Sequence, residues 1–220
     1  MSKVKEEQEE TNIEPAENTA LAAPAGEIVI DVEDIDIPRL SVVQKMSSSE
    51  FDHGSLVLDK SHEIIPAQTK TPCIILGAVK KWKEDIPFES EEMPTIAETK
   101  AEAKILEENS DYPILEYAEL MLMFPQPEGN EDDEAFPFPI GDTNYCVGKL
   151  YAQKDAYRKT YKALMTFAAF NRTATLGSRL WTFESQVMSK GKYSWFVPTL
   201  APTTVEVSEE VNEFVSSFSM

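Results

Sequence analysis

The chain has 220 residues, and its 39 acidic and 20 basic side chains give a formal net charge of −19. A hydrophobic content of 42% is enough for a packed core, which excludes a wholly disordered chain. No apolar run reaches the roughly 18 residues of a membrane span and no secretory leader pattern is present, so we expect a cytoplasmic protein without a membrane partner. The two cysteines, Cys73 and Cys146, form no CxxC pair, which argues against a disulfide framework and a zinc ribbon.

The charge is unevenly distributed along the chain. Residues 1–36 sum to −9 and residues 84–134 to −15, whereas residues 143–203 sum to +7. The charge of the whole chain argues against a nucleic-acid partner, because affinity for nucleic acid comes from neutralised phosphates. The positive charge of residues 143–203, which we call the basic block, makes a nucleic-acid partner possible for one part of the surface.

The first third of the sequence predicts an arm followed by short strands. Residues 1–36 lack a sustained hydrophobic period and predict a disordered acidic arm, with a short strand or docking patch at 28–30. We expect a single folded domain over residues 37–203. It begins with short strands, at 40–43, 56–58 and 64–65, and continues with a longer strand at 73–83. Gly77 within the longer strand indicates a β-bulge.

Residues 84–134 predict an acidic insert with a helix and a loop. Good helix formers over 96–108 carry few large apolar side chains, so this helix is expected to be exposed. A strand is predicted at 116–124, ending at Pro125. The loop at 128–134 lacks the Asp-x-Asp-x-Asp-Gly pattern of calcium loops and is expected to be a solvated acidic loop.

The last third contains the strongest periodic patterns. A strand is predicted at 145–151 and a long amphipathic helix at 152–170. Alternation predicts a strand at 179–188, a hairpin turn at 189–192 and a returning strand at 193–200 that ends at Pro198 and Pro202. Residues 204–220 predict an acidic C-terminal helix or tail, with Ser208 as the N-cap. The whole pattern predicts a β-rich α+β fold, with an antiparallel sheet or small barrel and two or three helices.

Catalytic patterns are missing from the sequence. The only histidines, His53 and His62, have no HExxH relation, and neither a phosphate-binding glycine loop nor a GxSxG elbow is present. Two Glu-x-Lys pairs, at 98–100 and 102–104, match half of a metal-dependent nuclease motif without its upstream acidic partner. An exposed acidic helix explains both pairs better. We therefore expect a protein that is not an enzyme, with no catalytic residue, metal or cofactor.

Cations and aromatic side chains alternate through residues 143–203. Single-strand binders use this mixture, because cations follow the phosphates while flat rings stack on bases. The predicted phosphate contacts are Lys149, Arg158, Lys162, Arg172, Arg179, Lys190 and Lys192. The predicted stacking residues are Trp181, Tyr193 and Trp195, with Trp82 as a further candidate. Packing in the core is the alternative for Trp181 and Trp195.

The order of several segments resembles a family of tailed-phage proteins, the OB-type single-stranded DNA-binding proteins of phage replication modules. The resemblance is carried by Ile-Pro-Arg-Leu-Ser-Val-Val-Gln at 37–44, Trp82, Phe-Asn-Arg-Thr at 170–173, Arg-Leu-Trp at 179–181 and Lys-Gly-Lys-Tyr-Ser-Trp-Phe-Val-Pro at 190–198. It implies a five-stranded OB barrel with added helices over about residues 37–218. The implied activity is sequence-tolerant binding of single-stranded DNA, with phage replication or recombination proteins as partners of the acidic termini.

Two features leave alternatives open. The helical spacing of the acidic C-terminal segment predicts that it docks on the fold instead of forming a free tail. The acidic surfaces also suit a virion-associated or adaptor protein that binds a basic protein partner. The sequence does not decide the oligomeric state, and a homo-oligomer is among the alternatives.

Overall fold

The computed structural model describes residues 21–22, 29–30 and 36–217, except for residues 88, 131 and 133. The chain divides into two compact units, Met1–Asp36 and Ile37–Met220. In the first unit, β1 (Leu21–Ala22) pairs antiparallel with β2 (Val29–Ile30). The disorder predicted for residues 1–36 concerns residues that lie mostly outside the described ones.

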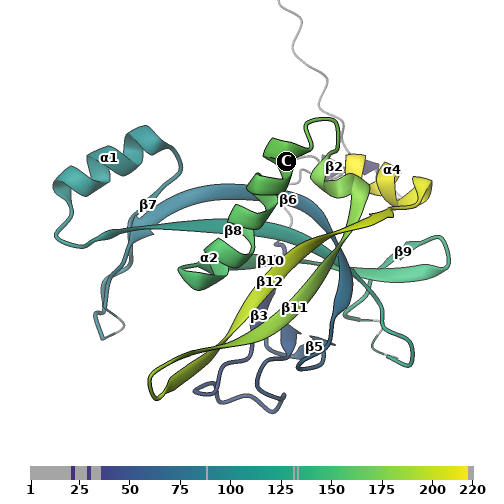
Figure 1. The fold of residues 1–220 in the computed structure, drawn as a ribbon, viewed down its shortest axis with the longest axis horizontal. Helices are drawn as coiled ribbons and strands as arrows, with labels where there is room; N and C mark the ends of the chain where they lie inside the picture. The colour runs from purple at the N-terminus through teal and green to yellow at the C-terminus, as the bar shows by residue number, and fades with distance from the viewer. Residues whose placement is uncertain are drawn as a thin grey trace, which may run out of the picture. The chain divides into compact units, whose positions relative to one another are not determined.

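The second unit is built on a strand-rich, curled sheet that forms half of a barrel, with helices packed around it (Figure 1). Its strands are β3 (Arg39–Val42), β4 (Leu56–Leu58), β5 (His62–Ile65), β6 (Thr71–Glu84), β7 (Ile96–Ala97), β8 (Ile114–Pro125), β9 (Phe138–Ile140), β10 (Thr143–Gln153), β11 (Arg179–Lys190) and β12 (Tyr193–Glu206). Its helices are α1 (Lys100–Asn109), α2 (Asp155–Lys159), α3 (Tyr161–Phe170) and α4 (Glu209–Ser217), with a 3-10 turn at Leu176–Ser178. None of the described helices is long and apolar enough to cross a membrane.

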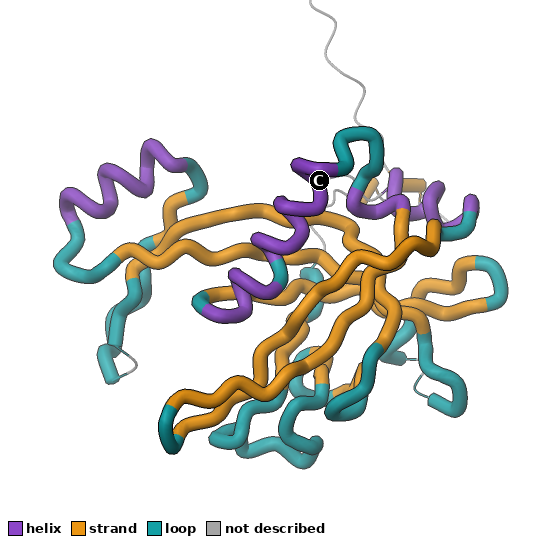
Figure 2. Tube along the Cα trace, viewed as in Figure 1, coloured by secondary structure: helices purple, strands orange, loops and turns teal. Residues whose placement is uncertain are grey.

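The strands follow the order β12-β11-β6-β8-β10-β3-β4-β5, with β7 beside β6 and β9 beside β10. Neighbouring strands in this path are antiparallel except β3 and β10, which run parallel. Figure 2 shows how the long central strands curl around the helices. The acidic segment 84–134 contains β8, which lies between β6 and β10 at the middle of the sheet. This segment is therefore part of the sheet and not only an added helix and loop.

The sheet buries both of its faces, which explains the long hydrophobic runs in its central strands. The inner face carries the main core, built from Leu120, Phe124, Trp181, Phe183 and their neighbours. The outer face of β6, β8 and β10 carries a second cluster, with Ile74, Met121, Met123 and Val147, against which α4 packs. The acidic C-terminal helix is therefore docked on the fold, as its spacing predicts.

Local details of α4 and β6 agree with the sequence patterns. The hydroxyl of Ser208 accepts a hydrogen bond from the Val211 N–H and caps α4. The pairing of β6 with β8 shifts register between Ile75 and Gly77, which confirms the predicted bulge. Cys73 and Cys146 are buried free thiols, and burial raises the pKa of Cys146 to about 12. Both cysteines are therefore small core residues and not reactive thiols.

The prediction of one long helix at 152–170 is wrong in two respects. β10 continues to Gln153, and the helical part is divided into α2 and α3 at Thr160. Thr160 has φ −111° and ψ −80°, and its buried hydroxyl donates to the Ala156 carbonyl at 2.7 Å. This side-chain bond to the preceding turn competes with the regular helical geometry. Similarly, the helix predicted from residue 96 begins after Thr99, because Thr99 and Glu102 form a capping box.

The prediction that Pro198 and Pro202 end the last strand is also wrong, because β12 continues through both prolines to Glu206. Among the described strands, β12 is an edge strand paired with β11 alone. The backbone N–H and C=O of Phe196 bond to Gln44, on the side away from β11. Because orientation alternates along a strand, the nitrogens of both prolines face that same side and no hydrogen bond to β11 is lost.

A single glutamine closes the gap between β3 and β12. The Gln44 side chain donates to the Phe196 carbonyl at 2.9 Å, and its oxygen accepts from the Phe196 N–H at 3.0 Å. This pair of bonds imitates one step of a β-ladder. The Phe196 ring lies so close to Gly54 that a Cβ there would be 2.7 Å from two ring carbons. Only glycine therefore fits at this position, where φ is +100°.

We predict that Gln44→Ala lowers the free energy of unfolding by about 1–3 kcal/mol, because it leaves two backbone groups of Phe196 without partners. Urea denaturation measures the loss, and amide exchange should show faster exchange of the Phe196 N–H. Gln186→Ala is the control, since that side chain bonds only to Glu184 in the described contacts. Unchanged protection of Phe196 in Gln44→Ala would show that the glutamine does not close the sheet.

Candidate nucleic-acid interface

A groove of about 540 Å³ lies where β3 and the end of β10 approach β12. We call it the seam groove. Its charged and aromatic lining comprises Arg39, Tyr151, Lys154, Asp155, Trp195 and the buried Phe196. Two cations and two accessible rings, those of Tyr151 and Trp195, therefore share one depression with a single carboxylate, Asp155. This is the mixture of chemistry that a nucleic-acid strand needs, because it offers partners to phosphates and bases together.

The parallel pairing of β3 with β10 positions the cation at one wall of the seam groove. Arg39 lies beside Lys149 in the register of these strands. Its guanidinium lies 5.1 Å from the centroid of the Tyr151 ring. The backbone N–H of Arg39 donates to the Asp59 carboxylate at 2.7 Å. Tyr151 is 41% exposed on the same face. The wall is thus a cation held over an accessible ring.

Lys154 and Trp195 come from the other elements of the seam groove. Lys154 connects β10 to α2 with a positive φ of 53°, a conformation that turns the chain sharply at this point. Its ammonium lies 3.1 Å from Asp85, with both side chains exposed to solvent. Trp195 is half-buried on β12, directly before the residue that Gln44 holds. Its place in the groove is therefore fixed by the closure of the sheet.

Two further depressions continue the seam groove around α2. One, of about 330 Å³, shares Lys154 and Asp155 with it, and another, of about 500 Å³, adjoins the first at Arg158. The cations lining the three depressions are Arg39, Lys70, Lys154, Arg158, Lys159 and Lys162, and the carboxylates are Glu116, Asp155 and Glu184. We call the five cations other than Arg39 the basic ridge. In a chain with a net charge of −19, this surface carries a local positive excess.

The cations of this surface are exchangeable partners for an anion. Arg158 pairs with Asp155 one turn away, and the Lys70 ammonium is 3.9 Å from Glu184. The cations of both pairs are exposed, whereas the carboxylates are half-buried. Because ion pairs at a protein surface contribute only about 0–1 kcal/mol, the exposed cations stay accessible to a phosphate. Lys162 lies 5.7 Å from the centroid of the Tyr157 ring. Since Tyr157 is a buried core residue, the ridge contributes charge to this surface and the accessible rings lie in the seam groove.

The electrostatics of Lys83 show how closely positive charge is gathered beside the seam groove. Burial lowers the pKa of Lys83. Asp85 opposes this shift, whereas the positive charges of Lys154 and Arg39 add to it. Cations from β3, β6 and the start of α2 thus act on one another here. Such a concentration of like charge is relieved when an anion binds.

The structure separates the residues that the sequence predicted as one interface. Arg158 and Lys162 lie together along α2 and α3, and Trp195 lies in the seam groove. Lys149 lies on the outer face beside Arg39. The remaining exposed residues lie elsewhere: Lys190, Lys192 and Tyr193 at the tip of the β11–β12 hairpin, apart from α2 in Figure 1, and Arg172 in the loop after α3. The predicted set therefore does not form one groove.

Two of the predicted contacts are structural. Trp181 is fully buried, its indole N–H donates to the Leu176 carbonyl at 3.0 Å, and the Phe167 ring meets it edge-on. The prediction that Trp181 stacks on bases is wrong for this conformation, because Trp181, Phe183 and Ser185 alternate along β11 on the side that faces the core. Arg179 is half-buried, lies 4.7 Å from the Phe167 ring centroid and donates to the Thr203 carbonyl. It contributes to packing where β11 begins.

The contacts predicted from the sequence did not include Arg39, Tyr151 or Lys154. Arg39 lies outside the basic block, and nothing in its local pattern indicates that it meets β10. The parallel pairing of β3 with β10 brings them together. The one available signal was the presence of Arg39 in the segment that carries the phage resemblance.

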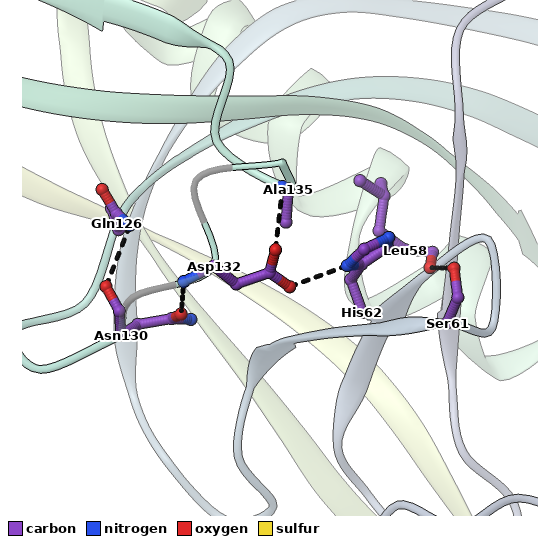
Figure 3. Close-up of polar contacts among 7 residues, drawn as sticks. All are labelled: Leu58, Ser61, His62, Gln126, Asn130, Asp132 and Ala135. Carbon is purple, nitrogen blue, oxygen red and sulfur yellow. Dashed lines mark hydrogen bonds and ion pairs between the residues drawn. The ribbon is translucent and has the colours of Figure 1, made fainter.

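A second polar cluster ties the acidic loop after β8 to β5 (Figure 3). The Nδ1 atom of His62 lies 2.7 Å from Oδ2 of Asp132, and the other Asp132 oxygen accepts from the Ala135 N–H. The Asp132 N–H donates to the side chain of Asn130. This loop is therefore anchored and not simply solvated. The Ser61 hydroxyl donates to the Leu58 carbonyl, so the contacts in Figure 3 do not join it to His62 as a nucleophile.

Comparisons of the chain with protein-family models, with curated proteins and with solved structures found no match. In the described part of the chain, no group of three or more His, Cys, Asp and Glu side chains is placed to hold a metal ion. Function is therefore inferred from the seam groove and the basic ridge.

We predict a pH-dependent contribution of the Asp132 contact to stability. The hydrogen bond from His62 lowers the pKa of Asp132 below its ordinary value of 3.8. The stabilisation is therefore present above that pH and is lost as the pH falls through the lower, folded-state pKa. The urea midpoint of the wild type should exceed that of Asp132→Asn near neutral pH and converge with it in acid. Asp142→Asn, in an exposed turn, is the control. A difference that stays constant with pH would contradict this assignment.

Proposed function

We propose that this protein binds single-stranded DNA without sequence preference, through the seam groove and the basic ridge. One observation carries the proposal: cations, the exposed ring of Tyr151 and the half-buried ring of Trp195 line one continuous surface of an otherwise acidic chain. Arg39 and the ridge cations would neutralise phosphates. Tyr151 and Trp195 would stack on bases, a contact worth about 1–3 kcal/mol per base.

The strand order supports the OB-type barrel that the sequence resemblance implies. β6, β8 and β10 form a meander, α2 and α3 follow, and β11 and β12 return beside β6. These five strands and the helical connection suit a partly open five-stranded barrel. In this assignment β3 fills the position between β10 and β12 where such a barrel closes. The seam groove would then be the incompletely closed edge of the barrel.

A single strand fits this surface better than a duplex. The rings of Tyr151 and Trp195 lie in the walls of a groove, where a base reaches them only when it is unstacked from its neighbours. The carboxylates of the surrounding surface repel a polyanion and restrict where it lands. The proposal includes the phage replication setting of the resemblance, with replication or recombination proteins as partners.

We predict that Arg39→Glu/Lys154→Glu weakens binding of a fluorescein-labelled oligo-dT by at least about tenfold, or about 1.4 kcal/mol. The slope of log affinity against log salt should become shallower by about 1.4, because two phosphate contacts are lost. Fluorescence anisotropy measures both. Lys100→Glu/Lys104→Glu on the exposed face of α1 changes the net charge equally and should leave the affinity nearly unchanged.

Trp195→Ala separates stacking from charge in the same assay. It should reduce affinity by about 1–3 kcal/mol without changing the salt slope. Absence of oligo-dT binding by the wild type at low salt would refute the proposed function. The adaptor function would then be favoured, and a pull-down would show a stable complex with a basic protein.

A further inference from the structure

The connection between β6 and β8 forms an acidic, partly apolar projection. We call residues 85–113, which include β7 and α1, the acidic arm. This arm is distinct from the N-terminal segment of residues 1–36. It contains nine carboxylates and two lysines. Ile96 and Ile105 are 53% and 62% exposed, and Ala103 is the buried residue of α1. Figure 1 shows α1 at the far end of β6 and β8. The arm thus presents apolar side chains to solvent within a field of negative charge.

The β11–β12 hairpin forms a second projection with the opposite charge. We call residues 187–193 the hairpin tip. It carries Lys190 and Lys192, and the sequence between Glu184 and Glu206 has no carboxylate. Val187 and Tyr193 are 53% and 66% exposed on it. The ammonium of Lys45 donates to Ser194 next to the tip and adds a third cation.

The chemistry of the two projections is complementary. Each exposes large apolar side chains that gain from leaving water, and the net charge around them is negative on the arm and positive on the tip. Opposite charges across an interface attract the partners and fix their orientation. Figure 1 shows the hairpin tip and α1 as separate extremities of the fold. In this structure, the hairpin tip and the acidic arm of one chain therefore do not contact each other. A contact between the two surfaces needs a second copy of the chain.

We propose that the hairpin tip of one copy docks on the acidic arm of a second copy. Because the two surfaces differ, the contact is heterologous and leaves a tip and an arm unoccupied at the ends of every pair. Association can therefore continue head to tail beyond the dimer. The proposal goes beyond the proposed function and does not depend on DNA.

Sedimentation velocity on the full chain without oligonucleotide tests the proposal. The weight-average mass should rise with protein concentration at low salt and fall when salt is added, because salt screens exposed charges. Lys190→Glu/Lys192→Glu and Glu107→Lys/Glu108→Lys should each sediment as monomers, since each pair of changes places like charges opposite one another where the tip meets α1.

An equimolar mixture of those two variants is the decisive sample. Each reversed surface meets its complement on the other variant, so the mixture should regain the concentration-dependent mass. Such a rescue excludes misfolding as the reason for the monomers. Lys100→Glu/Lys104→Glu is the control that matches the net charge of the tip variant. It makes the arm more acidic and should associate at least as strongly as the wild type.

Three outcomes would overturn the proposal. A wild type that stays monomeric at all concentrations at low salt shows that the surfaces do not bind each other. Two variants that stay monomeric alone and in the mixture show that the reversed residues do not face one another. A tip variant that associates like the wild type but loses oligo-dT affinity shows that nucleic acid is the occupant of the tip.

Discussion

The paired hydrogen bonds between Gln44 and Phe196 are the contact on which the arrangement of the candidate site depends. They join the free edge of β12 to the segment after β3 and so bridge the two edges of the curled sheet at one point. The contact does not extend along the edge, because Pro198 and Pro202 remove the donors that another ladder would need. The seam groove lies beside the paired hydrogen bonds of Gln44 and Phe196. Its walls are held by the sheet, which gives the exposed rings and cations a fixed separation.

The distribution of charge follows from this architecture. The acidic segment 84–134 contributes the central strand β8, so its apolar residues build the core while most of its carboxylates lie in the acidic arm and the loop. The cations of the basic ridge gather around α2, where β10 ends and β12 passes. A net charge of −19 is therefore compatible with an anion-binding surface. The acidic residues limit the area on which an anion can bind, but they do not remove it.

Local patterns predicted most of the strands, the Gly77 bulge, the hairpin turn and the docked C-terminal helix. These features depend on side chains a few residues apart. The failures arise from contacts between distant segments. Trp181 has the composition of a stacking residue, but the curl of the sheet places it inward. Arg39 becomes a site residue only because β3 pairs with β10, and β12 passes through two prolines only because it is an edge. Residue spacing along the chain does not encode these relations.

Photo-cross-linking of oligo-dT to the full chain, followed by mass spectrometry of the peptides, tests the central claim most directly, because it locates the bound strand. We predict cross-links at Tyr151 and Trp195, the two rings of the seam groove, and their loss when unlabelled oligo-dT competes. Cross-links restricted to Tyr193 at the hairpin tip, or an absence of cross-links at low salt, would contradict the seam groove as the binding site.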